Sequence, residues 1–342
     1  MSRVTLKDIA KKAGVTHATV SMALRNKDQI SEKTRERIQK LAKKMGYVPD
    51  PMLGRLNAYR TKSIGSAPRA AIGWINFWRN PEALNQNGVF HAYYKGACEM
   101  AQVLGYHVDS LLLHEKGMTL SRIESIMHSR NISGILIPPA ERPNETSLDL
   151  KWERYSVIKF GYSMVGVNSH LITNTQFETI RLAIRKAVER GFKKIGFHMA
   201  MIGEARTGDN FLGGYLRELY SRPELKKIEP LIVETSKDAF NKPLFMDWFQ
   251  KVKPDCILTQ LHDVGDWLQQ DGIRIPEDVA IISYALPAAN GIDYSGVQQN
   301  SHIIGQEAVV WLDRLIRHGQ RGIPKQPLEL LVEGSWVEGK TG

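Results

Sequence analysis

The chain has 342 residues, of which 42% are hydrophobic and 24% are charged, and its formal net charge is +10 at pH 7. This composition is that of a folded protein with room for a small head and a two-lobed body, and it excludes a disordered chain. The two cysteines, Cys98 and Cys256, are too few for a disulfide scaffold. No stretch is apolar for long enough to span a bilayer, so we expect no membrane partner.

Residues 5–46 are predicted to form three short helices. Thr5 caps the first helix together with Asp8, and Gly14 ends it in a left-handed conformation. Thr16 caps a second helix after a tight turn, and Ser31 begins a third. Residues at helical spacing are expected to close one shared core: Leu6, Ile9, Ala10, Val15, Val20, Leu24, Ile38, Leu41 and Ala42. A helix-turn-helix whose second helix is exposed can place side chains in a DNA major groove.

The excess positive charge lies in the same region. Residues 1–62 contain 15 lysines and arginines and 5 acidic residues, whereas the rest of the chain contains 31 of each. A solvated basic surface is the simpler interpretation of any single helix of this kind. A neutral body with a cationic head is better explained by a phosphate-rich partner, and we therefore expect double-stranded DNA.

From residue 70 onward the sequence alternates apolar runs with amphipathic segments. The first set of predicted strands covers 70–77, 107–113, 134–138 and 157–160, with helices at 93–104 and 120–129. The second set has strands at 194–198, 230–234, 256–259 and 279–284, with helices at 180–190, 211–220, 244–252 and 264–270. This alternation predicts an α/β body of two doubly wound lobes, in which ligands bind beyond the carboxyl ends of the strands.

The head resembles that of the lac-repressor (LacI/GalR) family of transcriptional regulators. The residues that carry the resemblance are Val4–Ala10, Ala13–Thr16, Thr19–Ser21, Ala23–Asn26, Ile30–Ser31, Thr34–Ile38 and Gly46–Pro49, with later markers at Gly272–Val279, Gln299, Ile304–Gly305 and Glu333–Val337. The resemblance covers essentially the whole chain. It implies a helix-turn-helix head at 1–48, a hinge helix and linker at 49–62, and a periplasmic-binding-protein-like body for effector binding and dimerisation at 63–342.

The resemblance also implies which residues contact DNA. His17, Ala18 and Met22 occupy the positions that reach base edges, although a methionine at helical spacing would otherwise be taken for a core residue. Leu56 matches the hinge leucine that wedges into the minor groove, with a plain linker as the alternative. The remaining matched residues are expected to contact phosphates or cap the backbone: Thr5, Thr16, Ser21 and Asn26.

An effector cleft is expected between the lobes, beyond the strand ends. The candidate residues, each of which could instead pack in a core, are Phe77, Trp78, Phe90, Tyr162, Phe211, Gln260, Asp263, Tyr284 and Gln299. The charged residues that the family uses there are absent, because Phe211 replaces an arginine, Ala285 replaces an aspartate and Thr175 replaces an acidic residue. Either the cleft takes a more apolar ligand class, or it binds no small molecule. Arg206, which we expect on a glycine-rich loop at 203–214, could supply a charge or simply be solvated.

The resemblance implies a bacterial cytoplasmic, nucleoid-associated regulator, most simply a repressor, that binds a palindromic operator as a homodimer and responds to an unidentified small-molecule effector. The alternative is a ligand-independent DNA-binding regulator whose body is a dimerisation or protein-interaction module. We expect no enzyme, because the sequence has no phosphate loop, dinucleotide fingerprint, serine elbow or paired His-Glu zinc motif. We also expect no cofactor and no metal.

Overall fold

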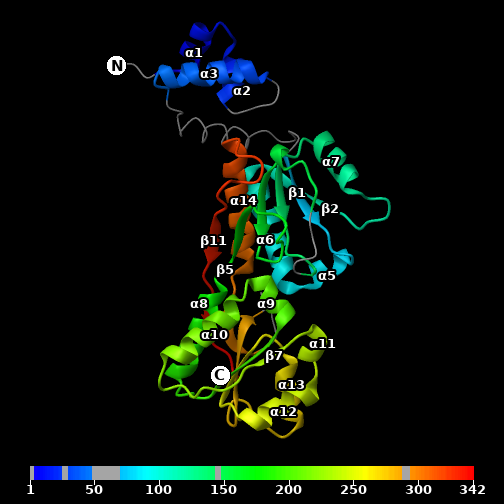
Figure 1. Cartoon of the computed structure of the whole chain (residues 1–342), viewed down its shortest axis with the longest axis vertical. Helices are drawn as coiled ribbons and strands as arrows, with labels where there is room; N and C mark the ends of the chain where they lie inside the picture. The colour runs from blue at the N-terminus through cyan, green and yellow to red at the C-terminus, as the bar shows by residue number, and fades with distance from the viewer. Residues whose placement is uncertain (1–3, 25–29, 48–69, 143–147, 287–292) are drawn as a thin grey trace.

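The structure is a computed structural model that describes residues 4–24, 30–47, 70–142, 148–286 and 293–342. Figure 1 shows a helical head at one end of an elongated molecule, followed by two lobes along its long axis. The predicted hinge at 49–62, and with it Leu56, lies outside the described residues, as does Asn26.

The head contains α1 (Leu6–Ala13), α2 (His17–Leu24) and α3 (Glu32–Lys44). The predicted capping box is confirmed, because the Asp8 N–H donates to the Thr5 hydroxyl at 3.4 Å and the Thr5 N–H donates to the Asp8 carboxylate at 2.8 Å. Gly14 has a φ of +67°, which ends α1 as predicted. The Thr16 hydroxyl accepts the Thr19 N–H at 3.1 Å and so caps α2. All nine predicted core residues lie in the head's apolar cluster or pack against it.

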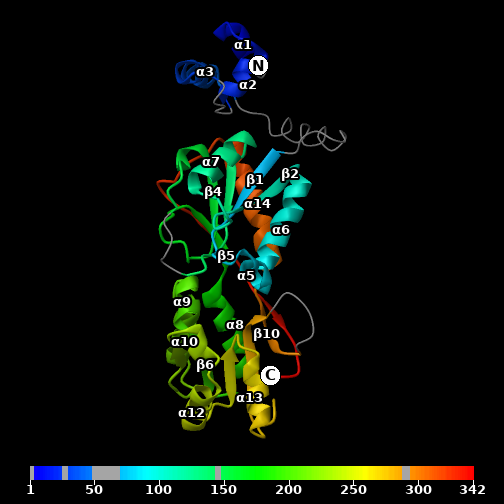
Figure 2. The ribbon, with the colours of Figure 1, turned by 90° about the vertical axis from the view of Figure 1, so that its right-hand side faces the viewer.

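The N-terminal lobe is a six-stranded sheet in the order β11-β5-β4-β3-β1-β2, and all its paired strands are parallel. The strands are β1 (Ala70–Asn76), β2 (Tyr106–Leu112), β3 (Gly134–Ile137), β4 (Ser156–Phe160), β5 (His170–Asn174) and β11 (Glu329–Val332). Helices α6 (Gly88–Leu104) and α14 (Ser301–Arg317) cover one face, and α7 (Leu120–Ser129) covers the other (Figure 2). The short helix α5 (Pro81–Gln86) follows β1, and a 3₁₀ turn (Trp152–Arg154) precedes β4.

The C-terminal lobe repeats this plan with the strand order β12-β10-β9-β8-β6-β7, in which only the β10–β12 pair is antiparallel. The strands are β6 (Ile195–Ala200), β7 (Leu231–Val233), β8 (Cys256–Thr259), β9 (Ala280–Leu286), β10 (Ser295–Gln298) and β12 (Ser335–Val337). Helices α8 (Gln176–Glu189) and α10 (Asn210–Ser221) cover one face, and α12 (Lys242–Val252) and α13 (Asp263–Gln270) cover the other. The short helices α9 (Met201–Thr207) and α11 (Ser236–Ala239) complete the lobe.

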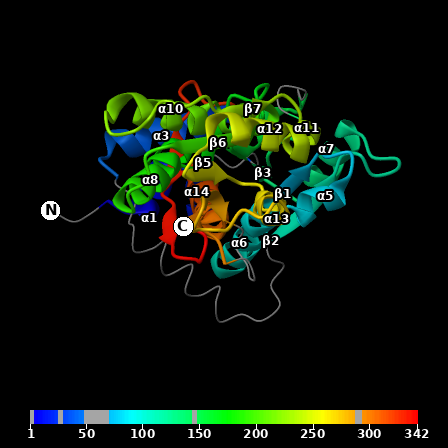
Figure 3. The same ribbon diagram turned by 90° about the horizontal axis from the view of Figure 1, so that it is seen from below.

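The chain passes between the two lobes at three places in its described part: from β5 to α8, from β10 to α14, and from β11 to β12. The Thr175 N–H donates to the Val332 carbonyl at 3.0 Å, and the Asn300 side chain donates to the Glu333 carbonyl at 2.8 Å. The first and second crossings are therefore each bonded to the third. Beyond the third crossing the C-terminal segment runs beside α8 (Figure 3), where Glu338 pairs with Arg190 at 2.6 Å.

Two glycines let α6 and α14 pack in direct backbone contact. A Cβ added to Gly96 would lie 2.1 Å from the carbonyl oxygen of His302, and one added to Gly305 would lie 2.1 Å from that of Tyr93. Any side chain at either position would push the helices apart. The α6–α14 contact therefore anchors the segment that follows the second crossing onto the N-terminal sheet.

The predicted alternation of strands and helices is confirmed, and the predicted helix 120–129 and strand 256–259 coincide with α7 and β8. The prediction of a glycine-rich loop at 203–214 is wrong. Most of that segment is helical, since α9 runs to Thr207 and α10 begins at Asn210, and Gly208 turns the chain between them with a φ of +65°. The elements that were not predicted are α14, β5, β10 and β11, together with the short helices α5, α9 and α11 and the 3₁₀ turn before β4.

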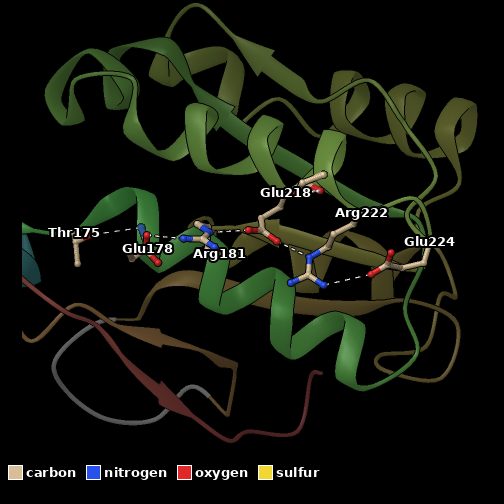
Figure 4. A network of polar contacts seen from close by, with 7 residues as sticks. Thr175, Glu178, Arg181, Glu218, Arg222 and Glu224 are labelled. Carbon is tan, nitrogen blue, oxygen red and sulfur yellow. Dashed lines mark hydrogen bonds and ion pairs between the residues drawn. The ribbon is translucent and has the colours of Figure 1, made fainter.

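A buried carboxylate joins α8 to α10 (Figure 4). Glu218 is 4% exposed, and it accepts hydrogen bonds from Arg181 Nε at 2.7 Å and Arg222 Nε at 2.5 Å. Burial raises the pKa of Glu218, but the hydrogen bonds from the two arginines outweigh it and leave this pKa below its ordinary value. Arg222 also reaches Glu224 at 3.3 Å on the exposed end of the network. The network holds the two helices of one face together.

Neutralising Glu218 is expected to destabilise the C-terminal lobe. Glu218→Gln should lower the free energy of unfolding by about 1–3 kcal/mol at neutral pH, because two arginines lose a charged acceptor. Since the folded-state pKa of Glu218 is depressed, the wild-type stabilisation exists above the ordinary glutamate pKa and disappears as the pH falls through the folded-state value. Urea unfolding should therefore show the gap between wild type and variant shrinking from about pH 7 to about pH 3.5.

Glu224→Gln is the matched control, because it removes the exposed carboxylate of the same network. Its unfolding curve should stay close to that of the wild type at both pH values. Equal losses in the two variants would contradict a special contribution from the buried carboxylate.

Candidate functional sites: the helical head and the interlobe cavity

One face of α2 points away from the core of the head. Val20 and Ala23 pack inward, whereas His17 and Ala18 are exposed at the first turn. Ser21 and Met22 are half-buried and lie one turn further along the same face. Met22 is not among the residues of the head's apolar cluster, within the part of the head that the structure describes. The four residues thus form a continuous surface that a groove of DNA could receive.

Thr5 and Thr16 lie at the amino-terminal ends of α1 and α2, and both are exposed. Helix amino-termini favour phosphate groups, because their outward N–H groups and the helix dipole are both positive. The hydrogen bonds of the Thr5 side chain and backbone lower the pKa of Asp8, so this cap remains ionised at neutral pH. The lysines of α1 add exposed positive charge at both ends of this helix, Lys7 in its first turn and Lys11 and Lys12 in its last.

A cavity of about 400 Å³ lies between the two lobes, at the carboxyl ends of their strands. The N-terminal lobe contributes Asn87, Gly88, Val89, Phe90, Tyr93, Pro139, Gly161, Thr173 and Asn174. The first crossing adds Gln176, and the C-terminal part of the chain supplies Met199, Ala200, Gly203, Arg206, Thr207, Phe211, Ala239, Phe240, Gln260, Leu261, His262, Ala285 and Gln299. Its size falls in the range of small-molecule sites.

The structure brings some of the predicted cleft residues together and separates others. Four of them line the cavity: Phe90, Phe211, Gln260 and Gln299. Trp78 and Tyr162 do not line the cavity, but both contact Arg206, which does. Phe77 and Tyr284 are buried in the lobe cores, and Asp263 is exposed at the start of α13, outside the lining. The roles of these residues stay predictions.

The positions of the family's charged residues are neutral here. The Phe211 ring lies 4.9 Å from the ring of Tyr284, between their centroids, and Ala285 adds only a methyl group to the lining. Thr175 caps α8, while its neighbours Asn174 and Gln176 face the cavity. The sequence analysis missed Asn174, since it ends a strand, β5, that was not predicted. None of the described lining residues is acidic.

Arg206 lies on α9 and reaches across the cleft. Its guanidinium carbon is 5.7 Å from the ring centroid of Trp78, and its Nη2 donates to the carbonyl of Glu141. Its own carbonyl accepts the Tyr162 N–H at 3.3 Å, so the backbone and the side chain both contact the N-terminal lobe. Burial lowers the pKa of Arg206, partly opposed by Glu141, but an arginine remains charged at neutral pH.

Glu204 fixes the helix that carries this arginine. It is 1% exposed, and its carboxylate accepts the Leu212 N–H at 2.6 Å and the Thr207 hydroxyl at 3.4 Å. Burial raises the pKa of Glu204 above its ordinary value, against the effect of these hydrogen bonds. The contacts join α9 to the start of α10, which holds Arg206 at the edge of the cavity.

Comparison with known proteins identifies the head and the body. The model of the lacI family of bacterial regulatory proteins matches residues 5–50, and that of the periplasmic binding protein-like domain matches residues 184–341. The chain is 25% identical over 289 residues to the transcriptional repressor PurR of Pectobacterium carotovorum subsp. carotovorum (strain PC1), covering 82% of this chain and 80% of the relative. The chain carries a lacI-family DNA-binding head. It is a DNA-binding transcriptional regulator with a periplasmic-binding-protein-like body.

Solved structures share the fold of this chain. The complex of the transcriptional regulator CelR with cellobiose superposes with a TM-score of 0.63 at 19% identity, covering 99% of this chain and all of the other. The lac repressor dimer bound to operator and the anti-inducer ONPF superposes with a TM-score of 0.58 at 18% identity, covering 99% of each chain. The predicted fold class, an all-α head with an α/β body of two lobes, is confirmed.

No helix among the described residues combines the length and apolarity needed to cross a membrane. In the same ranges no group of three or more His, Cys, Asp or Glu side chains is placed to hold a metal ion.

The left-handed conformation of Gly14, in the turn before α2, gives a test of what stabilises the head. Gly14→Ala should destabilise the turn by about 1 kcal/mol, because a Cβ is disfavoured at positive φ. Gly14→Asn should lose less, since asparagine tolerates the left-handed region better. Hydrogen exchange of residues 6–24 in the intact chain measures the effect, and unchanged protection in Gly14→Ala would show that the turn does not limit the stability of the head.

Proposed function

We propose that this regulator binds a palindromic operator as a homodimer and that a small molecule in the interlobe cavity changes its affinity for that operator. The observation that carries the proposal is the outward face of α2, where His17 and Ala18 are exposed on a head that, together with the linker after it (residues 1–62), holds all the excess positive charge of the chain. The exposed face supports base contacts, and the charge supports binding to phosphates.

The residue roles in the head follow from this geometry. His17 would exchange a hydrogen bond with a base edge, and Ala18 and Met22 would make apolar contacts such as those with a thymine methyl group. Thr5, Thr16 and Ser21 would position the head on the phosphate backbone. Asn26 and Leu56 keep the assignments of the sequence analysis, as a phosphate contact and a minor-groove wedge.

The body supports the regulatory half of the proposal. A dimer formed through it would set two heads on the two halves of a palindrome. A ligand that binds between the lobes would favour one interlobe arrangement and so change operator affinity. The complex of CelR with cellobiose and that of the lac repressor with operator and the anti-inducer ONPF are consistent with this use of the fold.

The alternative is a regulator that works without a ligand. The neutral residues Phe211 and Ala285 at the family's charged positions favour it. The cavity of about 400 Å³ and its unpartnered polar atoms favour an occupant. The proposal places the protein at the nucleoid of a bacterial cytoplasm and gives it no catalytic step.

Binding to DNA by the intact chain tests the first half of the proposal. Sequence selection from random duplexes, followed by fluorescence anisotropy, should yield a palindromic site whose affinity falls about a thousandfold across a fourfold rise in salt. A variant limited to residues 63–342 should remain a folded dimer and lose this binding. Specific binding by that shortened variant, or a flat salt response of the intact chain, would refute the assignment of DNA binding to the head.

His17→Ala tests the base contact. It should lower affinity for the selected operator by about 1–3 kcal/mol and relax the preference at one base pair of each half-site. Its effect on non-specific DNA should be small, because His17 is not assigned to phosphate. His91→Ala, which removes an exposed histidine of the body, is the control. A uniform loss of affinity over all sequences would place His17 on the phosphate backbone instead.

A further inference from the structure

We propose that the interlobe cavity binds a small aromatic carboxylate, held by Arg206 and Asn174. The inference rests on the proposed function, because it names the ligand class of the same cavity. It differs from the family pattern given above, in which the charged residues are the arginine and aspartate replaced here by Phe211 and Ala285.

The charge of the lining points to an anion. Arg206 is the one arginine or lysine among the described lining residues, and none of these residues is acidic. Glu141 does not neutralise Arg206 directly, because it offers its backbone carbonyl, while its carboxylate accepts the Arg79 N–H at 2.9 Å. A partly buried guanidinium without a hydrogen-bonded carboxylate is costly, and a bound anion would remove that cost.

The unpartnered polar atoms of the lining point the same way. Buried side-chain atoms without a hydrogen-bond partner include Arg206 Nε, Asn174 Nδ2 and His262 Nε2, and all three residues line the cavity. Asn174 is 3% exposed, and its Oδ1 accepts from Gln176 at 3.0 Å and from Thr173 at 3.3 Å, which leaves Nδ2 as the free donor. The Arg206 and Asn174 nitrogens only donate. A carboxylate only accepts, so it is the chemical complement of donors of this kind.

The rest of the lining suits a flat apolar body. Four aromatic rings face the cavity: Phe90, Tyr93, Phe211 and Phe240. Phe240 is 55% exposed despite its size, and Phe90 packs edge-on against Trp78, the residue beneath Arg206. A cavity of about 400 Å³ has room for a single ring with a short side chain.

Arg206 would bind the ligand and also makes a contact between the two lobes. The arginine belongs to α9 of the C-terminal lobe, but its carbonyl and its guanidinium bond to Tyr162 and Glu141 of the N-terminal lobe. An anion on Arg206 Nε would therefore share the guanidinium with the Glu141 carbonyl, which Nη2 holds. Binding and the arrangement of the lobes would be coupled through one side chain.

The test is ligand binding to the intact full-length protein by thermal shift and calorimetry. The probes are benzoate, 4-hydroxybenzoate, phenylacetate and cinnamate, each beside its neutral amide, with glucose and cellobiose as neutral sugars. At least one carboxylate should bind, and its amide of nearly the same shape should bind at least tenfold more weakly. The sugars should give no shift.

Two substitutions separate charge from folding. Arg206→Met keeps the length of the side chain without its charge, and Asn174→Asp is nearly isosteric but places a carboxylate where a donor stood. Each should raise the Kd of the bound carboxylate at least tenfold. Arg190→Met is the control, because Arg190 also stacks on a tryptophan, 5.0 Å from the Trp336 ring centroid, outside the cavity. It should leave the Kd unchanged.

The outcomes distinguish the inference of a carboxylate ligand from the broader proposal that the cavity binds an effector. If a carboxylate and its amide bind equally, or if Arg206→Met and Asn174→Asp both retain full affinity while folded, the anion inference is overturned. If a sugar binds and Arg206→Met binds it equally well, the inference fails but an effector cavity stands. If no probe of any class binds, both the inference and the effector half of the proposed function fail, while operator binding by the head is decided by its own test.

Discussion

The two-lobed body depends on an interlobe hinge, which is formed by the three hydrogen-bonded crossings of the chain and is distinct from the predicted hinge helix at 49–62. Thr175 and Asn300 each donate to the segment of the third crossing, at Val332 and Glu333. Three connecting segments bonded to one another are the arrangement found in hinge-type closure, in which two lobes rotate about the segments that join them. The cavity lies at this hinge, since Asn174 directly precedes Thr175. An occupant of the cavity therefore touches the part of the chain about which the lobes would turn.

The contact between α6 and α14 gives the hinge a fixed end. The absence of side chains at Gly96 and Gly305 brings the two helices into backbone contact, and α14 begins at the second crossing. Rotation of the lobes must therefore be taken up at the crossing residues and not by sliding of α14. The far side of the cleft has no such anchor: there, Arg206 joins the lobes through one side chain and one carbonyl. A hinge with one fixed end, opposite a contact made by a single residue, makes the interlobe angle sensitive to what binds Arg206.

The sequence predicted the elements whose signals are local. Apolar runs predicted most strands to within a few residues, and the caps at Thr5 and Thr16 and the stop at Gly14 were confirmed, since each needs only its immediate neighbours. β11 was missed because it lies at the sheet edge with every second residue exposed, which gives it no buried run. α14 was missed although its apolar residues recur at helical spacing, so that signal was present. Arg206 was named as a possible source of charge, but its contacts were out of reach, because they depend on α9 meeting Trp78, which is far away in sequence.

The cleft has its positive charge at Arg206 on α9 and not at position 211 on α10. This difference affects how a bound ligand would act on the contact between the lobes. A charged residue at position 211 would act from α10, whose first turn packs in the core of the C-terminal lobe through contacts such as that of Phe211 with Tyr284. Arg206 instead acts from α9, and its bonds already reach the N-terminal lobe. A ligand on Arg206 would thus alter a contact between the lobes in the same step in which it binds. Coupling of this kind needs no separate relay through the hinge, because the binding residue and the interlobe contact are one side chain.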